Sequence, residues 1–255
     1  MSWKAIARSA TGTSHLKQQI PCQDYGGCKV LDRAIIGAVA DGAGSAIHAD
    51  VGAKLAVDTV LECLTKENFS GLPPDEEEAR GLFTQVVRKV IATLEAQAIS
   101  QGYAIAELSC TLLAFIATPT WVAAMQIGDG FIVLRCQHEQ PQLLFSPDKG
   151  EYINETTFVT SATALAGMKV DVRSHQPEFI CAATDGLERV AIRMSDWTPF
   201  TPFFHPLEQY LREASDLEQE DEYLLRFLDS DRLNARTDDD KTLLLCCYDD
   251  SSNSR

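Results

Sequence analysis

The stretch AIIGAVADGAG, residues 34–44, decides how the central part of this chain folds. Residues 34–40 form an uninterrupted apolar run, which is typical of a strand buried on both faces. Asp41 follows at once, so its carboxylate is expected at the rim of the core, at the end of a rigid element. Gly42 and Gly44 allow the backbone to approach a ligand more closely than a residue with a side chain would.

Four further aspartates occupy similar places elsewhere in the chain. They are Asp24 in CQD, Asp129 in IGDG, Asp185 in ATDG and Asp239 in DDDKT. For any one of them alone, a turn or a helix cap is the ordinary explanation. If all converge, their negative charges cannot stay together without cations. Divalent metal ions bound through oxygen are then the obvious candidates.

The composition excludes two classes of partner. With a formal net charge of −15 over 255 residues and no cluster of Lys and Arg, the chain lacks the cationic surface that nucleic acid requires. No stretch approaches the ~18–20 apolar residues that would span a bilayer, and residues 1–15 lack the apolar part of a secretion signal. We therefore expect no nucleic acid and no membrane among the partners, and a cytoplasmic location.

The eight cysteines agree with that location and do not indicate a zinc site. No C-x-x-C pair occurs, so a structural zinc site is not expected. Cys110, Cys181, Cys246 and Cys247 lie inside apolar runs and are expected to be core residues. Because Cys246 and Cys247 are adjacent in a predicted strand, they should face opposite sides of the sheet.

Two helices are expected after the first strand. The first, over residues 50–66, is capped by Asp50 and carries Val51, Leu55, Val60 and Leu64. The second begins at the acidic residues 75–78, which suit the positive end of a helix. It continues to about residue 98 with apolar residues at three- and four-residue spacing.

The pattern then changes to short apolar runs, at residues 108–118, 121–127, 131–136 and 142–145. Their short connections favour antiparallel hairpins. Beyond a polar segment at 146–176, interpreted as a flap, we expect strands at 179–184 and 242–248, a helix at 207–228 and a frayed tail at 249–255. No internal repeat or linker divides the chain, so residues 1–255 are expected to form a single α+β domain.

The motifs taken together resemble one protein family. In order they are QD, DGAG after a strand, SCTLL, IGDG, TDG and DDKT, and they resemble those of the metal-dependent protein phosphatase 2C family. The phrases GTSHLKQQIPCQD and EYINETTFVTS further resemble a compact bacterial branch of it. The resemblance covers about residues 12–245 and implies a four-layer α-β-β-α sandwich, with two antiparallel sheets face to face and helices outside.

The resemblance also implies roles for individual residues. Asp41 would bridge two metal ions, and the Gly42 carbonyl, Asp185 and Asp239 would complete the ligands of the pair. Asp24 would help to hold the surrounding waters, and Asp129 would bind an additional, looser ion. An all-oxygen site suits Mg²⁺ or Mn²⁺. Two ions are expected, and a third could bind at Asp129.

The chain departs from the family pattern at several positions. Ala43 stands where many members have a histidine that protonates the leaving oxygen, and we expect His15 or His48 to replace it as general acid. His15 as a purely structural residue is the equal alternative. Lys17-Gln18-Gln19 stands where an arginine would hold the phosphate, so Lys17 is the candidate substrate-binding residue. An exposed lysine without a ligand is the alternative and the commoner outcome for such a residue. Gln23 stands where many members have an acidic residue before the aspartate of the QD motif. Arg189 stands where an aspartate is expected four residues after Asp185, and Glu188 lies one position before it.

The reading that follows is a metal-dependent protein serine/threonine phosphatase. Two divalent ions would lower the pKa of a shared water and place it in line with phosphorus, and they would neutralise the phosphoryl oxygens. Its partner would be a phosphorylated protein, in opposition to a Ser/Thr kinase in signalling. The alternative is a pseudo-phosphatase that keeps the fold but acts only as a binding or regulatory module. Ser109, Cys110 and Thr111 are expected to be structural.

Overall fold

The computed structural model describes residues 2–69, 71–145, 156–214 and 217–249. Two five-stranded sheets make up its centre, and every pairing within them is antiparallel. The first sheet has the order β1 (Ser2–Ala10), β12 (Lys241–Asp249), β9 (Pro177–Ala183), β6 (Phe131–Cys136) and β7 (Gln142–Leu143). The second has the order β2 (Tyr25–Val30), β3 (Ile35–Ala40), β4 (Leu112–Ala117), β5 (Val122–Ile127) and β8 (Lys169–Arg173).

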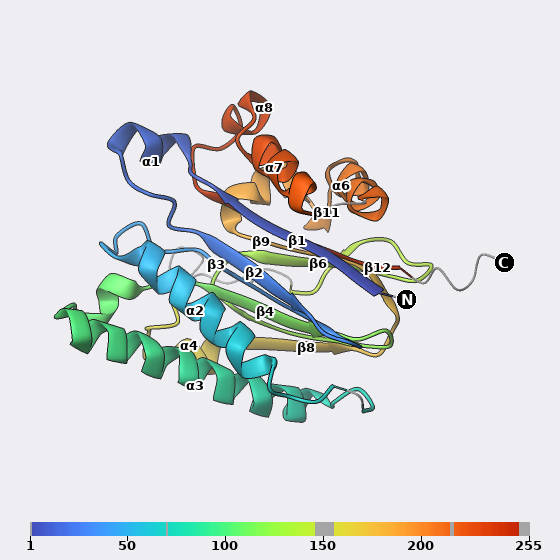
Figure 1. Cartoon of the computed structure of the whole chain (residues 1–255), viewed down its shortest axis with the longest axis horizontal. Helices are drawn as coiled ribbons and strands as arrows, with labels where there is room; N and C mark the ends of the chain where they lie inside the picture. The colour runs from blue at the N-terminus through green and yellow to red at the C-terminus, as the bar shows by residue number, and fades with distance from the viewer. Residues whose placement is uncertain (1, 70, 146–155, 215–216, 250–255) are drawn as a thin grey trace.

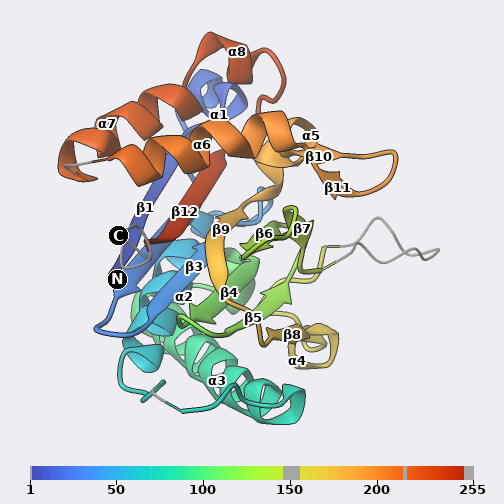
Figure 2. The ribbon, with the colours of Figure 1, turned by 90° about the vertical axis from the view of Figure 1, so that its right-hand side faces the viewer.

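Helices cover the outer face of each sheet (Figures 1 and 2). Helices α2 (Ala49–Leu64) and α3 (Glu76–Gln101) pack on the second sheet, and α6 (Thr201–Glu213) and α7 (Leu217–Leu228) pack on the first. Separate apolar clusters lie under each helical layer and between the sheets. The predicted four-layer sandwich is therefore confirmed.

Strand β12 shows how one short sequence serves two of these cores. Leu243, Leu245 and Cys247 face the helices, whereas Leu244, Cys246 and Tyr248 face the other sheet. The period of two in a strand makes this division unavoidable. It confirms the expectation that Cys246 and Cys247 point to opposite sides.

Several short elements link these layers. They are α1 (Thr13–Gln18), the 3₁₀ turns η1 (Ile105–Leu108) and η2 (Asp185–Leu187), α4 (Ala164–Gly167), α5 (Glu188–Ala191), the ribbon of β10 (Ile192–Arg193) and β11 (Thr198–Pro199), and α8 (Asp231–Asn234). None of the helices in the described ranges is both long and apolar enough to cross a membrane.

One predicted hairpin is wrong. β5 and β6 follow each other closely, but β5 belongs to the second sheet and β6 to the first. Gly128 makes the crossing with φ 101°, and a Cβ there would lie 2.5 Å from the Thr111 methyl group. Only glycine fits both that backbone conformation and that contact.

Three predicted elements have different bounds. The strand expected from residue 108 starts at Leu112, because η1 occupies Ile105–Leu108. The helix expected over 207–228 is two helices, because Ala214 leaves helical geometry with ψ 122°. Helix α2 starts at Ala49 after His48, so Asp50 lies in its first turn and is not its cap.

The flap prediction over 146–176 is too wide, because Lys169–Arg173 is strand β8, paired with β5. Residues 146–155, including Asn154 and Glu155, lie outside the described residues, as does the predicted frayed tail beyond Asp249.

The sequence patterns did not predict β1, β2 or α1. In β1 the buried residues Trp3, Ile6 and Ala10 are spaced three and four apart, which is not the alternation of a strand. In β2, Gly26 and Gly27 lower the strand propensity. Pairing with β12 and β3 makes strands of both.

Candidate active site

Three aspartates from distant parts of the chain meet at one end of the sandwich. Asp41 follows β3, Asp129 lies at the crossing between the sheets, and Asp185 opens η2 after β9. One carboxylate oxygen of each lies within 4.8 Å of the others. Like charges at this separation repel strongly unless cations or protons lie among them.

Asp24 and Asp239 surround this group. Asp24 is buried and accepts a 2.6 Å hydrogen bond from the Thr184 hydroxyl, which in turn accepts one of 2.9 Å from the Thr242 amide. Asp239 lies on the loop before β12, and its charge acts on both Asp41 and Asp185. The two residues thus belong to the same electrostatic cluster, although neither is within the 4.8 Å group.

The cluster changes the acidity of its members. Burial raises the pKa of Asp41 to about 11, and the charges of Asp24, Asp185 and Asp239 add to the rise. Burial likewise raises the pKa of Asp24 to about 8, although the hydrogen bond from Thr184 acts to lower it. For Asp185, burial followed by the charges of Asp129 and Asp239 raises the pKa to about 6. Carboxylates in this state are suited to ions such as Mg²⁺ or Mn²⁺, which supply positive charge and prefer oxygen ligands.

The backbone of Asp41 is held on both sides. Its amide donates to the Thr111 hydroxyl at 2.9 Å, and its carbonyl accepts from the Thr111 amide at 2.8 Å. The Gly42 amide donates to the Gln23 carbonyl, and a Cβ at Gly42 would lie 2.7 Å from that oxygen. The sequence motif around Thr111 is thus structural, as expected. Its specific task, which sequence reasoning missed, is to position Asp41.

Cys110 is part of the same support. It is fully buried and forms an isolated bridge with Gly42. Burial raises the pKa of its thiol to about 12, so the thiolate needed for nucleophilic chemistry is not formed near neutral pH.

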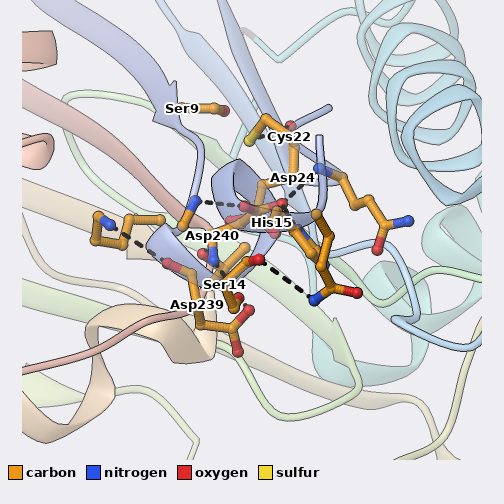
Figure 3. A network of polar contacts seen from close by, with 12 residues as sticks. Ser9, Ser14, His15, Cys22, Asp24, Asp239 and Asp240 are labelled. Carbon is orange, nitrogen blue, oxygen red and sulfur yellow. Dashed lines mark hydrogen bonds and ion pairs between the residues drawn. The ribbon is translucent and has the colours of Figure 1, made fainter. Parts of the chain in front are cut away.

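Asp240 joins three parts of the site (Figure 3). Its buried carboxylate accepts 2.6 Å hydrogen bonds from the Gly12 and Gln23 amides and lies 3.0 Å from His15 Nδ1. Asp240 therefore fixes the loop that leads to Asp24 against the loop that carries Asp239. The family resemblance places Asp240 beside Asp239 in a supporting position. It could not name the groups that the Asp240 carboxylate contacts, because those lie more than two hundred residues away in the chain.

The histidine candidates differ in their surroundings. His15, on α1, places its Nδ1 3.0 Å from the carboxylate of Asp240, the residue next to Asp239. His48 stacks on Tyr103, with ring centroids 3.7 Å apart, and its Nε2 lies 3.7 Å from the Glu107 carboxylate. The structure therefore brings His15, rather than His48, into contact with the aspartate network. Lys17 is exposed on α1.

Two further residues reach the cluster. Glu188 is half-buried, and its pKa is raised by burial and then by the charges of Asp185 and Asp129. Thr156 donates a 2.6 Å hydrogen bond from its hydroxyl to Asp129. No local pattern pairs Thr156 with Asp129, although EYINETTFVTS is a distinctive phrase. Arg189 is exposed on α5, and its positive charge opposes the rise in the pKa of its neighbour Glu188.

Comparison with known proteins agrees with this geometry. The family model described as protein phosphatase 2C matches residues 11–229. Serine/threonine-protein phosphatase 3 of Escherichia coli (strain K12) is 34% identical over 258 residues, covering 97% of this chain and 99% of the relative.

Solved structures are similar in fold. The S. agalactiae serine/threonine phosphatase has a TM-score of 0.66 at 14% identity, over 97% of this chain and 100% of that one. The catalytic domain of the serine threonine protein phosphatase PstP, in complex with 2 manganese ions, has a TM-score of 0.62 at 14% identity, over 96% and 98%. With the family model matching most of its length and the ordered acidic motifs converging in space, the chain belongs to the protein phosphatase 2C family.

Proposed function

We propose that this protein hydrolyses phosphoserine and phosphothreonine in other proteins, as a metal-dependent phosphatase. The observation that carries the proposal is the meeting of Asp41, Asp129 and Asp185 within 4.8 Å, with Asp24 and Asp239 beside them. The E. coli relative is named a serine/threonine-protein phosphatase, and its similarity extends over nearly the whole of both chains.

The proposed metal site uses this chain's own oxygen atoms. Asp41, the Gly42 carbonyl, Asp185 and Asp239 would hold two Mg²⁺ or Mn²⁺ ions, with Asp24 supporting them and Asp129 offering a place for a third. The two manganese ions of PstP support this number. When bound, such ions activate water for attack on phosphorus and neutralise the phosphoryl oxygens. Asp240 and Thr111 keep the carboxylates in position, so the site needs little rearrangement before reaction.

Lys17 and His15 have the remaining proposed roles. Lys17 on α1 would supply positive charge to the substrate phosphate, without the paired geometry of an arginine. Unchanged KM for a phosphopeptide in Lys17→Ala would refute that role. His15, held through Nδ1 by Asp240, would give a proton to the leaving oxygen.

The pseudo-phosphatase alternative has no support from these findings. A module that only binds a partner has no use for a complete, converging set of acidic residues. Such a cluster raises the free energy of the fold whenever cations are absent.

The cellular setting is proposed on chemical grounds. All eight cysteines are unpaired, which is usual for proteins of the cytoplasm. A phosphoprotein substrate implies a Ser/Thr kinase that acts in the opposite direction, and hence a role in signalling.

The deciding experiment measures hydrolysis of p-nitrophenyl phosphate with Mn²⁺, with Mg²⁺ and with EDTA. We expect turnover only with metal, and a loss of at least about 100-fold in kcat in Asp41→Asn and Asp239→Asn. Asp32→Asn, an exposed aspartate at the opposite end of β3, is the matched control. Calorimetric Mn²⁺ binding without any turnover would contradict the proposal and favour the pseudo-phosphatase.

A further inference from the structure

A cavity of about 780 Å³ lies among α5, the β10–β11 ribbon, α6, α7 and α8, outside the aspartate cluster. Its volume is typical of ligand sites, which span ~300–1,000 Å³. Much of its wall is aromatic, with Phe203 and Phe227 at 6.1 Å between ring centroids. Phe200 and Tyr223, also in the wall, keep 42% and 60% of their surface exposed. Large aromatic side chains left open to solvent around a cavity are suited to an apolar or aromatic ligand.

Four arginines line the same cavity, namely Arg189, Arg193, Arg232 and Arg236. Arg193 is 3.2 Å from Asp196. For the other three, the described part of the chain offers no carboxylate within ion-pair distance and no hydrogen-bond acceptor to the guanidinium. The charge of Arg189 acts on its neighbour Glu188. In a chain of net charge −15, four arginines in a lining that includes no Asp or Glu are a local concentration of positive charge. They favour an anionic ligand, above all one with carboxylates or phosphates.

Elements that line the cavity adjoin elements that carry the aspartates. Arg189, on α5, is four residues beyond Asp185, which opens the preceding 3₁₀ turn η2. Asn234 of α8 accepts a 2.9 Å hydrogen bond from Lys241 Nζ, which also lies 3.3 Å from the Asp239 carbonyl. Lys241 is fully buried, and its two hydrogen bonds connect α8 to the loop that carries Asp239. Figures 1 and 2 show α8 beside α1, the helix that carries His15.

We propose that this cavity docks the segment of the phosphoprotein substrate that flanks the phosphorylated residue, and that it selects aromatic and acidic side chains there. The proposal rests on the proposed phosphatase function. An extended peptide advances ~3.3 Å per residue. Residues a few positions from a phosphothreonine at the aspartates would occupy the cavity, where phenylalanines contact the aromatic wall and glutamates contact the arginines.

The test compares phosphothreonine peptides in which these flanking positions alternate glutamate and phenylalanine, on either side, with peptides carrying glycine and serine there. We expect the wild-type protein to prefer one of the acidic aromatic peptides by about tenfold in kcat/KM, chiefly through KM. The double variant Arg232→Glu/Arg236→Glu should lose this preference while hydrolysing p-nitrophenyl phosphate at the wild-type rate. Both residues are exposed, so the variant should fold normally.

The matched control is Arg88→Glu/Lys89→Glu, which changes the net charge equally on the exposed face of α3. It should keep the peptide preference. No preference in the wild type, or an unchanged preference in the Arg232/Arg236 variant, would overturn the docking proposal.

Direct binding separates this proposal from the phosphatase function. Fluorescence anisotropy with an unphosphorylated glutamate/phenylalanine peptide needs no turnover, and we expect at least about tenfold weaker binding in the Arg232→Glu/Arg236→Glu variant. If the wild type hydrolyses nothing but binds this peptide through the arginines, the phosphatase proposal fails and peptide recognition by the cavity stands. A wild-type dimer that dissociates in the variant would overturn the proposal in favour of a second copy of the chain as occupant.

Discussion

At the scale of single residues, the aspartates at the end of the sandwich are the most unusual feature of the chain. Burial and mutual repulsion raise the pKa values of Asp24, Asp41 and Asp185, so without cations the fold retains protons that the unfolded chain would release. The same residues that prepare the site for metal therefore make the metal-free protein sensitive to pH.

The first prediction concerns that sensitivity. The protonated aspartates stabilise the folded state, because their pKa values are higher there than in the unfolded chain. This contribution is fully present below the unfolded pKa of about 4. It is lost as pH rises through about 6 for Asp185 and about 8 for Asp24. The difference in Tm between protein in Mn²⁺ and protein in EDTA should therefore widen from pH 5 to pH 8, as thermal melts can measure. Asp24→Asn should reduce the widening, and parallel curves in the wild type would contradict the account.

The second prediction concerns His15. If its ring donates a proton to the leaving oxygen, His15→Ala should lower kcat about 100-fold for an alkyl phosphate, whose leaving group is poor. It should have a much smaller effect for p-nitrophenyl phosphate, which needs no proton. Equal losses on both substrates would show that the hydrogen bond to Asp240 is a structural one. His48→Ala is the control and should not distinguish the substrates, since His48 stacks on Tyr103.

At the scale of elements, α3 illustrates how local chemistry starts a helix. Asp75 accepts from the Glu78 amide at 2.8 Å, and the Glu78 carboxylate accepts from the Asp75 amide at 3.0 Å. These reciprocal bonds form a capping box. The acidic first turn predicted the start of this helix correctly, because both capping hydrogen bonds join residues within one four-residue stretch.

The third prediction tests this cap. Asp75→Ala should lower the free energy of unfolding by about 1 kcal/mol, since it leaves the Glu78 amide without its acceptor. Denaturant unfolding measures the change. Glu77→Ala removes a charge from the same turn but no capping bond, and its effect should be distinctly smaller. Equal effects would mean that the helix dipole, rather than the cap, accounts for the stabilisation.

At the scale of the whole molecule, the contact between the two sheets places the aspartates together. Phe115 of β4 is fully buried in the cluster between the sheets. A Cβ at Gly37 of the neighbouring strand would lie 2.4 Å from its ring, so the two positions are closely fitted. Loss of this packing would loosen both ends of the sandwich, including the end at which Asp41 and Asp185 meet.

The fourth prediction follows from that packing. Phe115→Ala should lower the free energy of unfolding by about 3–5 kcal/mol, because it removes buried surface and leaves a cavity. The control Leu72→Ala changes a side chain that is 92% exposed and should have no measurable effect. Denaturant melts with Mn²⁺ present would compare them. A loss below about 1 kcal/mol for Phe115→Ala would show that the interface between the sheets repacks easily.

The sequence by itself determined the elements whose signals are local. The apolar run before Asp41, the periodic face of α3 and the placing of each acidic motif beside a strand all depend on residues a few positions apart. The family resemblance, which rests on the order of those motifs, predicted the four-layer sandwich. It also pointed to the aspartates that lie together.

Only the tertiary structure decided which sheet each strand joins and which distant groups meet. β1 is a strand because Ser2 to Ala10 pair with Asp249 to Lys241, at the other end of the chain. Asp240 holds Gly12 and His15, Thr156 holds Asp129, and arginines from α5 and α8 share one cavity. Such contacts depend on how whole elements pack, since the free energy of a strand pair or a buried hydrogen bond comes from partners that local patterns do not specify.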